Sequence, residues 1–280
     1  MFGREYANHL DILIQSFEQI NENYQNRIKT GGKKNLAEKL KKLYISVFGI
    51  PEIGFQIRSL YFEKILTSRK FLKSFKSILD AGCGIGAYTF LLAKRFKKAK
   101  IIGGDIDKQK LNICRTLTGE LSVKNADFTY LDITEKQNTA KYDLIVNIDV
   151  LEHIDHYELA LENFSNLLRK DGYLYIHAPQ PNQQRIFKSL RQWRHEDHAH
   201  EGIIKNELEE KLKKLGFKIV TSMETFGFFG KLSWELNHLT LSKNFFIAGL
   251  LYPLLNIIAN LDLWQKNKNG LGIAVLSQKI

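Results

Sequence analysis

The chain has 280 residues, of which 44% are hydrophobic and 25% are charged. This composition excludes a fibrous or wholly disordered chain, and the length allows one large α/β domain with additions or two small domains. The formal net charge of +11 favours nucleic acid, an anionic membrane or an anionic substrate as partners, without choosing among them.

The N-terminal quarter is predicted to be helical, because apolar residues recur at helical spacing at 10–20 and 36–47 and again from Ile57 to Leu72. The first residues lack the apolar core of a signal peptide. The two cysteines, Cys83 and Cys114, are too few for a disulfide framework. We therefore expect a cytoplasmic protein, with a peripheral position on the inner membrane face as an alternative.

From Ser77 onward, short apolar runs alternate with helical segments, which is typical of a parallel sheet wrapped by helices. The pattern predicts a doubly wound, Rossmann-like α/β fold with a seven-stranded sheet. The expected strands are 77–80, 100–104, 124–130, 143–148, 172–178, 216–220 and 273–276, and the expected helices between them are 87–96, 107–119, 157–169 and 206–215.

Four segments follow from this pattern. Residues 1–75 are expected to form a helical cap and 76–225 a cofactor-binding α/β core, while 226–270 form an apolar helical insertion and 271–280 add the final strand to the core. The apolar run at 245–258 has nearly the composition of a membrane span. Because the last strand must return to the same sheet, we expect instead a lid over the acceptor site, a dimer surface or a helix in the membrane interface. The oligomeric state stays open.

A glycine-rich turn follows the first strand. Glycine lets a ligand approach the backbone closely, and the helix N-terminus that follows presents free N–H groups to it. The spacing Gly82-x-Gly84-x-x-Ala87 also fits the dinucleotide fingerprint, so the loop alone allows an NAD-dependent oxidoreductase. Asp80 argues against a dinucleotide cofactor, because a carboxylate at this position is unfavourable beside a pyrophosphate. It suits a cofactor that carries a cationic amino acid and a sulfonium.

Two further carboxylates follow the next two strands. Asp105 lies about 20 residues past the loop, where an acidic side chain can accept hydrogen bonds from ribose hydroxyls. Asp132 offers a carboxylate to an adenine amino group, and Ile133 an apolar side chain to its face. Ile106 and Ile133 could equally belong to the core, and Asp107 could be a helix N-cap.

The motifs D-A-G-C-G-I-G, G-G-D-I-D, L-D-I, Y-D-L-I-V-N-I-D-V-L-E-H-I and L-L-R-K-D-G-Y-L-Y-I-H-A-P-Q-P follow one another from residue 80 to residue 181. In order and spacing, this series resembles class I S-adenosylmethionine-dependent methyltransferases of the small-molecule and ubiquinone-pathway type. The resemblance implies S-adenosylmethionine as the cofactor. The cofactor contacts that it implies, with neighbouring loop residues, are Asp80, Gly82, Cys83, Gly84, Gly86, Asp105, Ile106, Asp132, Ile133, Asn147 and Asp149.

Acceptor chemistry is expected at the end of the fourth strand. Methyl transfer from a sulfonium mainly needs alignment, and a hydroxyl acceptor also gains from a general base or a metal ion. Asp149, Glu152 and His153 resemble an acidic-x-x-Glu-His arrangement that ubiquinone-pathway O-methyltransferases use for a divalent cation, with Asp where those usually carry Glu. These three residues could hold a metal, or Glu152 and His153 could brace the next loop.

A second histidine cluster spans His195 to His200, in the long loop after the fifth strand. We take Glu152, His153 and His198 as the acid/base candidates, with an exposed polar loop as the alternative for the cluster.

The leading expectation for function is O-methylation of a small-molecule, glycan or lipid intermediate. A nucleic-acid methyltransferase, an NAD-dependent oxidoreductase and an inactive binding protein of the same fold are the alternatives. The chain lacks the Asn/Asp-Pro-Pro-aromatic motif of amino-directed base methyltransferases, which argues against a nucleic-acid substrate.

Overall fold

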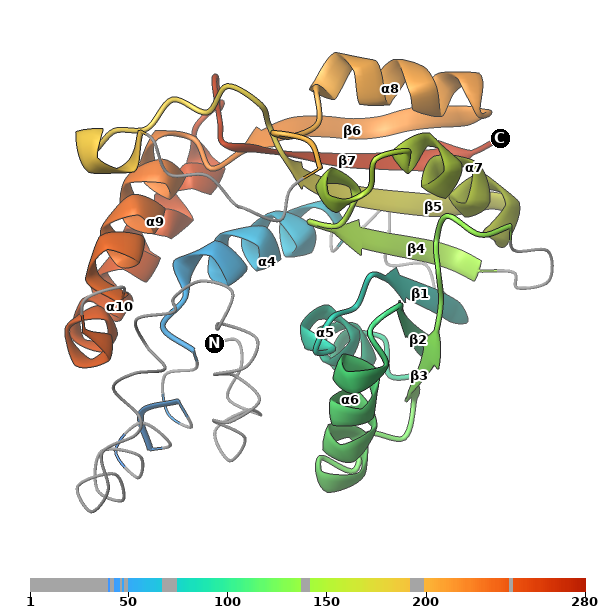
Figure 1. The fold of residues 1–280 in the computed structure, drawn as a ribbon, viewed down its shortest axis with the longest axis horizontal. Coiled ribbons are helices and arrows are strands. Elements are labelled where there is room, and N and C mark those ends of the chain that lie inside the picture. The colour runs from blue at the N-terminus through green and yellow to red at the C-terminus, as the bar shows by residue number, and fades with distance from the viewer. Residues whose placement is uncertain are drawn as a thin grey trace.

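A computed structural model describes residues 40, 43–45, 47, 50–66, 75–136, 142–191, 199–241 and 244–280. In these residues seven strands form one sheet in the order β3-β2-β1-β4-β5-β7-β6, and β7 runs antiparallel to both its neighbours (Figure 1). The predicted Rossmann-like, seven-stranded α/β fold is therefore confirmed. The strands are β1 (Ser77–Ala81), β2 (Lys100–Asp105), β3 (Ala126–Tyr130), β4 (Tyr142–Ile148), β5 (Leu168–Pro179), β6 (Phe217–Thr225) and β7 (Gly272–Lys279).

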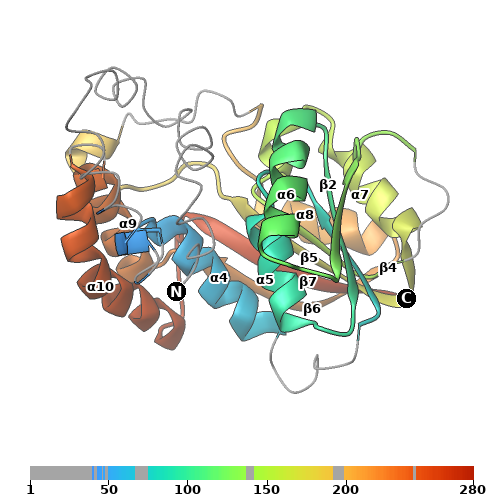
Figure 2. The same cartoon turned by 90° about the horizontal axis from the view of Figure 1, so that it is seen from below.

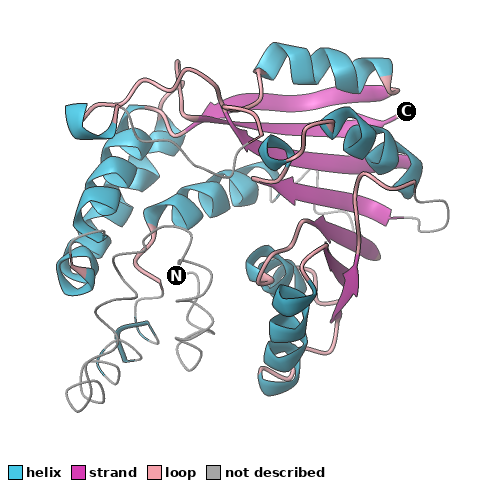
Figure 3. Ribbon diagram, viewed as in Figure 1, coloured by secondary structure: helices cyan, strands magenta, loops and turns pink. Residues whose placement is uncertain are grey.

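Helices cover both faces of the sheet, so the domain has three layers (Figure 3). One face carries α4 (Ile53–Leu66), α5 (Ala87–Arg95) and α6 (Lys108–Glu120), and the other carries α7 (Tyr157–Leu167) and α8 (Lys205–Lys214). A separate apolar cluster fills the space between the sheet and each helical layer. Burial of the apolar strand residues on both faces is the main stabilising term of this fold.

Four elements differ from the sequence prediction by more than two residues at one end, and one of them is β7, which continues to Lys279 rather than ending at 276. α4 begins at Ile53 because the carboxylate of Glu52 accepts hydrogen bonds from the N–H groups of Gly54 and Phe55. β5 begins at Leu168, which pairs with Tyr142 ahead of an irregularity in the ladder. β6 continues to Thr225 along β7. The helix expected over 10–20, and residues 67–72 of the expected third helix, lie outside the described residues.

The segment between β6 and β7 forms a helical hairpin of α9 (Phe228–Leu241) and α10 (Phe245–Leu261), closed by a short 3₁₀ turn, Asp262–Trp264. Figure 2 shows this hairpin beside α4, at one end of the sheet. Tyr252 and Leu255 of α10 are buried in an apolar cluster with Ile53 and Ile57 of α4. The hairpin therefore belongs to the folded domain rather than extending from it.

Three buried polar side chains fasten the hairpin to the domain. The carboxylate of Asp262 accepts hydrogen bonds from the N–H groups of Gly227 and Gly230, both at 2.9 Å, and from the Tyr61 hydroxyl at 2.7 Å. Asn237 accepts from the N–H of Ile53 at 3.0 Å and donates to the Pro51 carbonyl at 2.9 Å.

Glu235 of α9, which is also fully buried, accepts hydrogen bonds from the N–H groups of Ile186 and Phe187 at 3.0 and 2.8 Å. These two residues belong to the loop that follows β5. A buried carboxylate is tolerated when such donors satisfy it. The hairpin is thus tied to the start of α4 and to this loop, on the side of the sheet where the parallel strands end.

Candidate active site

The glycine-rich turn connects β1 to α5 and lies against the end of β2. The N–H groups of Gly82 and Cys83 donate to the Gly104 carbonyl at 2.8 and 3.0 Å. Gly82 has a φ of +78°, and a Cβ there would lie 2.4 Å from Cγ2 of Val150. Gly84 has a φ of +53°, and a Cβ there would meet no atom within 4 Å. The turn is therefore packed at Gly82 and open at Gly84, where a ligand can approach the backbone.

Two of the expected carboxylates lie at this turn. Asp80 is 2% exposed and accepts a hydrogen bond from the Thr89 hydroxyl at 2.6 Å. Burial raises the pKa of Asp80 to about 7, and the nearby Asp105 contributes in the same direction. Asp105 accepts from the N–H groups of Gly84 at 2.7 Å and Asp107 at 2.9 Å. Asp105 thus holds the turn in place, while Asp80 is poised for a positively charged ligand that would favour its ionised form.

Other expected contacts of the turn support its shape. Cys83 is buried, with its Sγ 3.8 Å from the Gly84 carbonyl oxygen, so little of it can reach a ligand. Gly86 is the N-cap of α5, with a φ of +82°. Both residues position the backbone that a ligand would meet.

The residues that we expected at the adenine differ in their exposure. Asp132 accepts from the N–H of Thr134 at 2.8 Å and from its hydroxyl at 2.6 Å. Ile133 packs in the core and is only 5% exposed, as in the alternative that the sequence left open, and its contact with an adenine ring stays a prediction. Ile106 is 62% exposed and is the residue with apolar surface free at this edge. Asp107 caps α6, which is the structural alternative that the sequence allowed.

The end of β4 holds an unsatisfied acceptor. Asn147 is fully buried and its Nδ2 donates to the Ala81 carbonyl at 2.9 Å. Its Oδ1 has no hydrogen-bond partner in the described part of the chain. An orphaned buried acceptor costs about 1–3 kcal/mol, so a ligand with a donor group would be stabilised there.

Asp149 follows β4 and joins three elements. Its carboxylate forms an ion pair with Arg58 of α4 and accepts a hydrogen bond from Nδ1 of His177 in β5 at 2.6 Å. Nε2 of His177 forms a hydrogen bond with the Thr225 hydroxyl at 3.0 Å. Burial alone would lower the pKa of Arg58, but Asp149 and other neighbouring acidic groups raise it above its ordinary value. Arg58 therefore carries its positive charge at the end of the sheet.

Glu152 lies beside this pair. It is 1% exposed, and its Oε2 has no hydrogen-bond partner among the residues that the structure describes. Burial, and then the charge of Asp149, raise its pKa well above the ordinary value. The adjacent His153 is exposed at the surface. Of the acid/base candidates after β4, Glu152 is the one that faces Asp149 and Arg58.

The histidine cluster after β5 is described only in part. His198 lies outside the described residues. The N–H of His200 donates to the Glu152 carbonyl at 3.0 Å, and its Nε2 lies 3.1 Å from the carbonyl oxygens of Ile154 and Asp155. The end of the histidine loop therefore contacts the turn that carries Glu152.

The divalent cation that we considered for Asp149, Glu152 and His153 is not supported. Over the described ranges, no group of three or more His, Cys, Asp or Glu side chains is arranged to hold a metal ion. The physical reason is local, because Arg58 and His177 already occupy the Asp149 carboxylate while His153 lies at the surface.

Sequence reasoning missed Arg58, His177, Tyr88 and Tyr175. The hydroxyl of Tyr175 is buried without a hydrogen-bond partner among the described residues, and burial raises the pKa values of both tyrosines. His177 and Tyr175 lie inside an otherwise apolar strand, and Arg58 lies in a helix far from the motifs. Only a clue such as a polar residue within a predicted buried strand could have drawn attention to His177.

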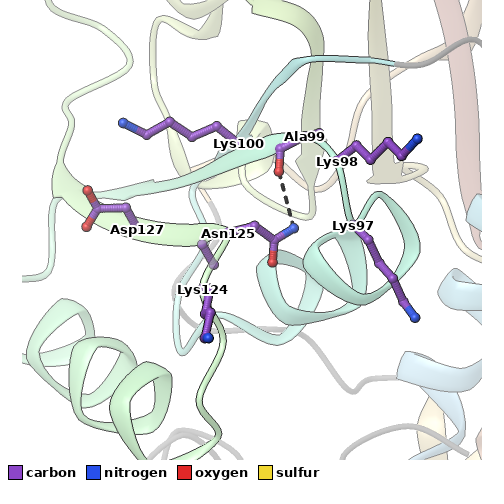
Figure 4. A pocket seen from close by; sticks show the side chains of 8 residues that line it. Lys97, Lys98, Ala99, Lys100, Lys124, Asn125 and Asp127 are labelled. Atoms are coloured by element: carbon purple, nitrogen blue, oxygen red, sulfur yellow. Dashed lines mark hydrogen bonds between the residues drawn. The ribbon is translucent and has the colours of Figure 1, made fainter.

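A basic pocket lies elsewhere on the molecule (Figure 4). It is lined by Lys97, Lys98, Lys100 and Lys124, with Asn125 bonded to the Ala99 carbonyl at 3.2 Å. These residues precede or begin β2 and β3, so the pocket lies at the amino ends of the strands. Ligands of this fold class bind at the carboxyl ends, so we do not assign the chemistry to this pocket.

Comparison with known proteins bears on the family of the chain. Residues 72–216, just over half of the chain, match a family described as a methyltransferase domain. The (S)-coclaurine N-methyltransferase of Papaver somniferum is 28% identical over 127 residues, which are 45% of this chain and 35% of that protein. The match therefore spans about a third of the length of this curated relative.

Two solved structures share the fold. Coclaurine N-methyltransferase bound to N-methylheliamine and SAH has a TM-score of 0.54 at 21% identity, over 80% of this chain and 72% of that one. Geranyl diphosphate methyltransferase in complex with GPP and sinefungin has a TM-score of 0.56 at 13% identity, over 79% and 78%.

These findings decide between the cofactor families that the glycine turn alone left open. The dinucleotide alternative fails, because the family match covers the turn and the carboxylates that follow the next two strands. The chain belongs to the class I S-adenosylmethionine-dependent methyltransferases.

Proposed function

We propose that this protein transfers the methyl group of S-adenosylmethionine to an oxygen atom of a small-molecule acceptor, a class that includes glycan and lipid intermediates. The observation that carries the proposal is Glu152, a buried acid with an unpartnered oxygen beside Arg58 and Asp149. It lies at the carboxyl end of β4, where acceptors meet cofactors in this fold class.

The cofactor would be held by the turn from Gly82 to Gly86. Asp105 is suited to the ribose hydroxyls, and Ile106 with Asp132 to the adenine. Asp80 and the orphaned Oδ1 of Asn147 suit the cationic amino-acid portion. When bound, the cofactor supplies an activated methyl group on a sulfonium. The residues of the chain align the acceptor with it and exclude water.

Acid/base chemistry falls to Glu152. Its oxygen without a hydrogen-bond partner among the described residues can accept the proton of an acceptor hydroxyl. The guanidinium of Arg58 would stabilise the oxyanion as it forms. Asp149 and His177 are positioning residues in this scheme, since they hold Arg58 through the contacts described above. We retain His153 and His198 as candidates for passing the proton to solvent.

N-methylation is the second candidate, because the sequence is similar to coclaurine N-methyltransferase. An ammonium acceptor would also have to lose a proton before it attacks. Both acceptors would lose their proton to the same unpartnered oxygen of Glu152, so the matched hydroxyl and amine acceptors below distinguish the two candidates.

We also propose a cytoplasmic location, which the two free, buried cysteines support. The division into 1–75, 76–225, 226–270 and 271–280 stays our proposal for the organisation of the chain. It assigns cofactor binding to the second segment and coverage of the acceptor to the first and third.

The direct test uses methyl-labelled S-adenosylmethionine with metabolite extracts and matched pairs of hydroxyl and amine acceptors, with Mg²⁺ or with a chelator. We expect label on hydroxyl acceptors and no effect of the chelator. Label on amines alone would exclude oxygen as the target. Calorimetry compares the binding of S-adenosylhomocysteine with that of NAD. A protein that does not bind S-adenosylhomocysteine would exclude the proposed methyltransferase activity.

Glu152→Gln tests the proposed base. The substitution keeps the size of the side chain and removes its proton chemistry. We expect kcat to fall by about 10²- to 10⁴-fold while the affinity for S-adenosylhomocysteine changes little. Glu162→Gln, at an exposed position on α7, is the matched control. Equal activity in the two variants would exclude Glu152 as the base.

A further inference from the structure

A continuous stripe of large apolar side chains lies along the outer face of α10. Spacings of three and four residues place these side chains on one side of a helix. Leu250 is 80% exposed and Trp264 is 89% exposed, whereas apolar residues on most protein surfaces are scattered singly. We call it the outer stripe; its members are Phe246, Ile247, Leu250, Leu254, Ile257, Leu261 and Trp264.

Within the described residues, the outer stripe is exposed and takes no part in the apolar clusters. The opposite side of α10 supplies Tyr252, Leu255 and Ala259 to the apolar cluster with α4. The segment Phe245–Trp264 is long and apolar enough to cross a membrane. It is nevertheless packed against α4 and α9, and the chain continues from it into β7 between β5 and β6. A helix lying on a surface fits these contacts, and a spanning helix does not.

The charge around the outer stripe indicates which surface it meets. Glu235 and Asp262 are the only acidic side chains between 226 and 280, and both are buried within the fold. Lys266 and Lys268 follow Trp264 directly, and Lys64 donates to the Leu263 carbonyl at the same end at 2.7 Å. The stripe therefore has cations at its Trp264 end, and its own segment exposes no acidic side chain.

We propose that the outer stripe of α10 docks on an anionic phospholipid bilayer, with the helix axis parallel to the membrane. The apolar side chains would enter the headgroup and acyl boundary, and the lysines would meet anionic headgroups. A second copy of the chain fits less well, because a symmetric contact would bring the same lysines together in a protein of net charge +11. The docking requires no methyl transfer, so it can fail or hold independently of the proposed reaction.

Phe226 links the buried side of α10 to the acceptor side. Its ring lies in the apolar cluster with Tyr252 of α10, and the guanidinium of Arg58 lies 5.6 Å from the centre of that ring. A bilayer on the outer stripe would therefore be separated from the elements that border Glu152 by α10 itself, which is the distance that an apolar acceptor would cross between lipid and site.

The experiment is co-sedimentation of the full chain with vesicles of phosphatidylcholine alone or with phosphatidylglycerol added. We expect binding to the anionic vesicles that weakens at high salt. Leu250→Asp/Leu254→Asp should lower the bound fraction at least about tenfold. The control is Leu159→Asp/Ile204→Asp, which changes two residues 45% and 46% exposed on other elements. Circular dichroism confirms that both variants are folded. Absence of wild-type binding, or equal loss in both variants, would overturn the proposal.

Trp264 gives a second readout. Its emission should shift to the blue with anionic vesicles and be quenched by brominated lipid, and Trp264→Phe should remove that part of the signal. Analytical ultracentrifugation tests whether a second copy of the chain binds the outer stripe instead. Self-association that the Leu250→Asp/Leu254→Asp variant abolishes, without vesicle binding, would assign the outer stripe to a second copy and reject the membrane.

Discussion

Nδ1 of His177 lies 2.6 Å from a carboxylate oxygen of Asp149, and the backbone N–H of Asp149 donates to the His177 carbonyl at 2.9 Å. His177 therefore holds both the side chain and the backbone of Asp149. The backbone needs this support, because Asp149 has a φ of +53°, which few residues other than glycine adopt. The pair fixes the point from which Asp149 reaches Arg58 on α4.

Asp149→Asn should destabilise the protein by about 1–3 kcal/mol, because Arg58 loses the charge that balances it. Asparagine tolerates the left-handed conformation, so the backbone is not a confounding factor. Chemical denaturation measures the loss. Asp155→Asn, at an exposed position in the next turn, is the control, and an equal effect of the two variants would contradict a structural role for the ion pair.

Gly82→Ala and Gly84→Ala should separate the packed and open parts of the glycine turn. The first variant places a Cβ 2.4 Å from Val150 and should lower the free energy of unfolding by about 2–4 kcal/mol. The second meets open space and should cost only about 1 kcal/mol for its backbone conformation. It should still weaken binding of S-adenosylhomocysteine, measured by calorimetry, because the new methyl group occupies the side that a ligand approaches.

Val150→Ala provides a check on the first of these variants. It removes the two Val150 methyl groups that the new Cβ would meet, so the double variant Gly82→Ala/Val150→Ala should be more stable than the sum of the single changes predicts. Strict additivity would show that the contact with Val150 is not the cause of the loss.

Asp80 should make cofactor binding depend on pH. Its pKa in the folded protein is about 7, above the ordinary value of 3.8, so the folded state holds a proton that the unfolded state releases between these values. The free energy of unfolding therefore loses a contribution as the pH rises toward 7.

A cationic ligand favours the ionised form of Asp80, so S-adenosylmethionine should bind more tightly as the pH rises from about 6 to about 8 and should release a proton near pH 7. Calorimetry in buffers of different ionisation enthalpy measures this release. Asp80→Asn should remove the proton release and weaken binding. Unchanged proton release in that variant would assign it to another group.

Asp262→Ala should loosen the α9–α10 hairpin. It leaves the N–H groups of Gly227 and Gly230 and the Tyr61 hydroxyl without their acceptor, at a cost of about 3–5 kcal/mol. Hydrogen exchange should show faster opening in α9 and α10 than in β1 and β4. Asp155→Ala is the control, and uniform exchange throughout the domain would indicate global unfolding instead.

The sheet and the cofactor turn could be predicted from the sequence because their signals are local. A run such as Ile145 and Val146 is apolar throughout because both faces of a parallel strand are buried, and the glycines of the turn are neighbours in the chain. The polar half of β6 was missed because a prediction from local pattern recognises only apolar strands. Thr221 and Ser222 do not resemble a buried strand, yet they pair with β7.

The acceptor side could be predicted only in part. Glu152 lies in a recognisable motif, but its burial and its unpartnered oxygen depend on the packing of distant elements. Arg58 and Asp149 are 91 positions apart, and no pattern in either segment indicates that they meet. Ile106 and Ile133 both follow a cofactor motif, yet Ile133 packs in the core while Ile106 is exposed, a difference that depends on packing rather than on the local pattern.

The last rung of the β6–β7 ladder pairs Thr225 with Gly272. The chain leaves the sheet after Thr225 and re-enters it at Gly272, beside the residue that it left. The length of the segment between them therefore has no effect on the register of the two strands. A longer, shorter or unrelated hairpin could be grafted between these two residues without disturbing the cofactor half of the domain. The architecture thus lets the acceptor side diverge in evolution while the methyl-donor side stays constant.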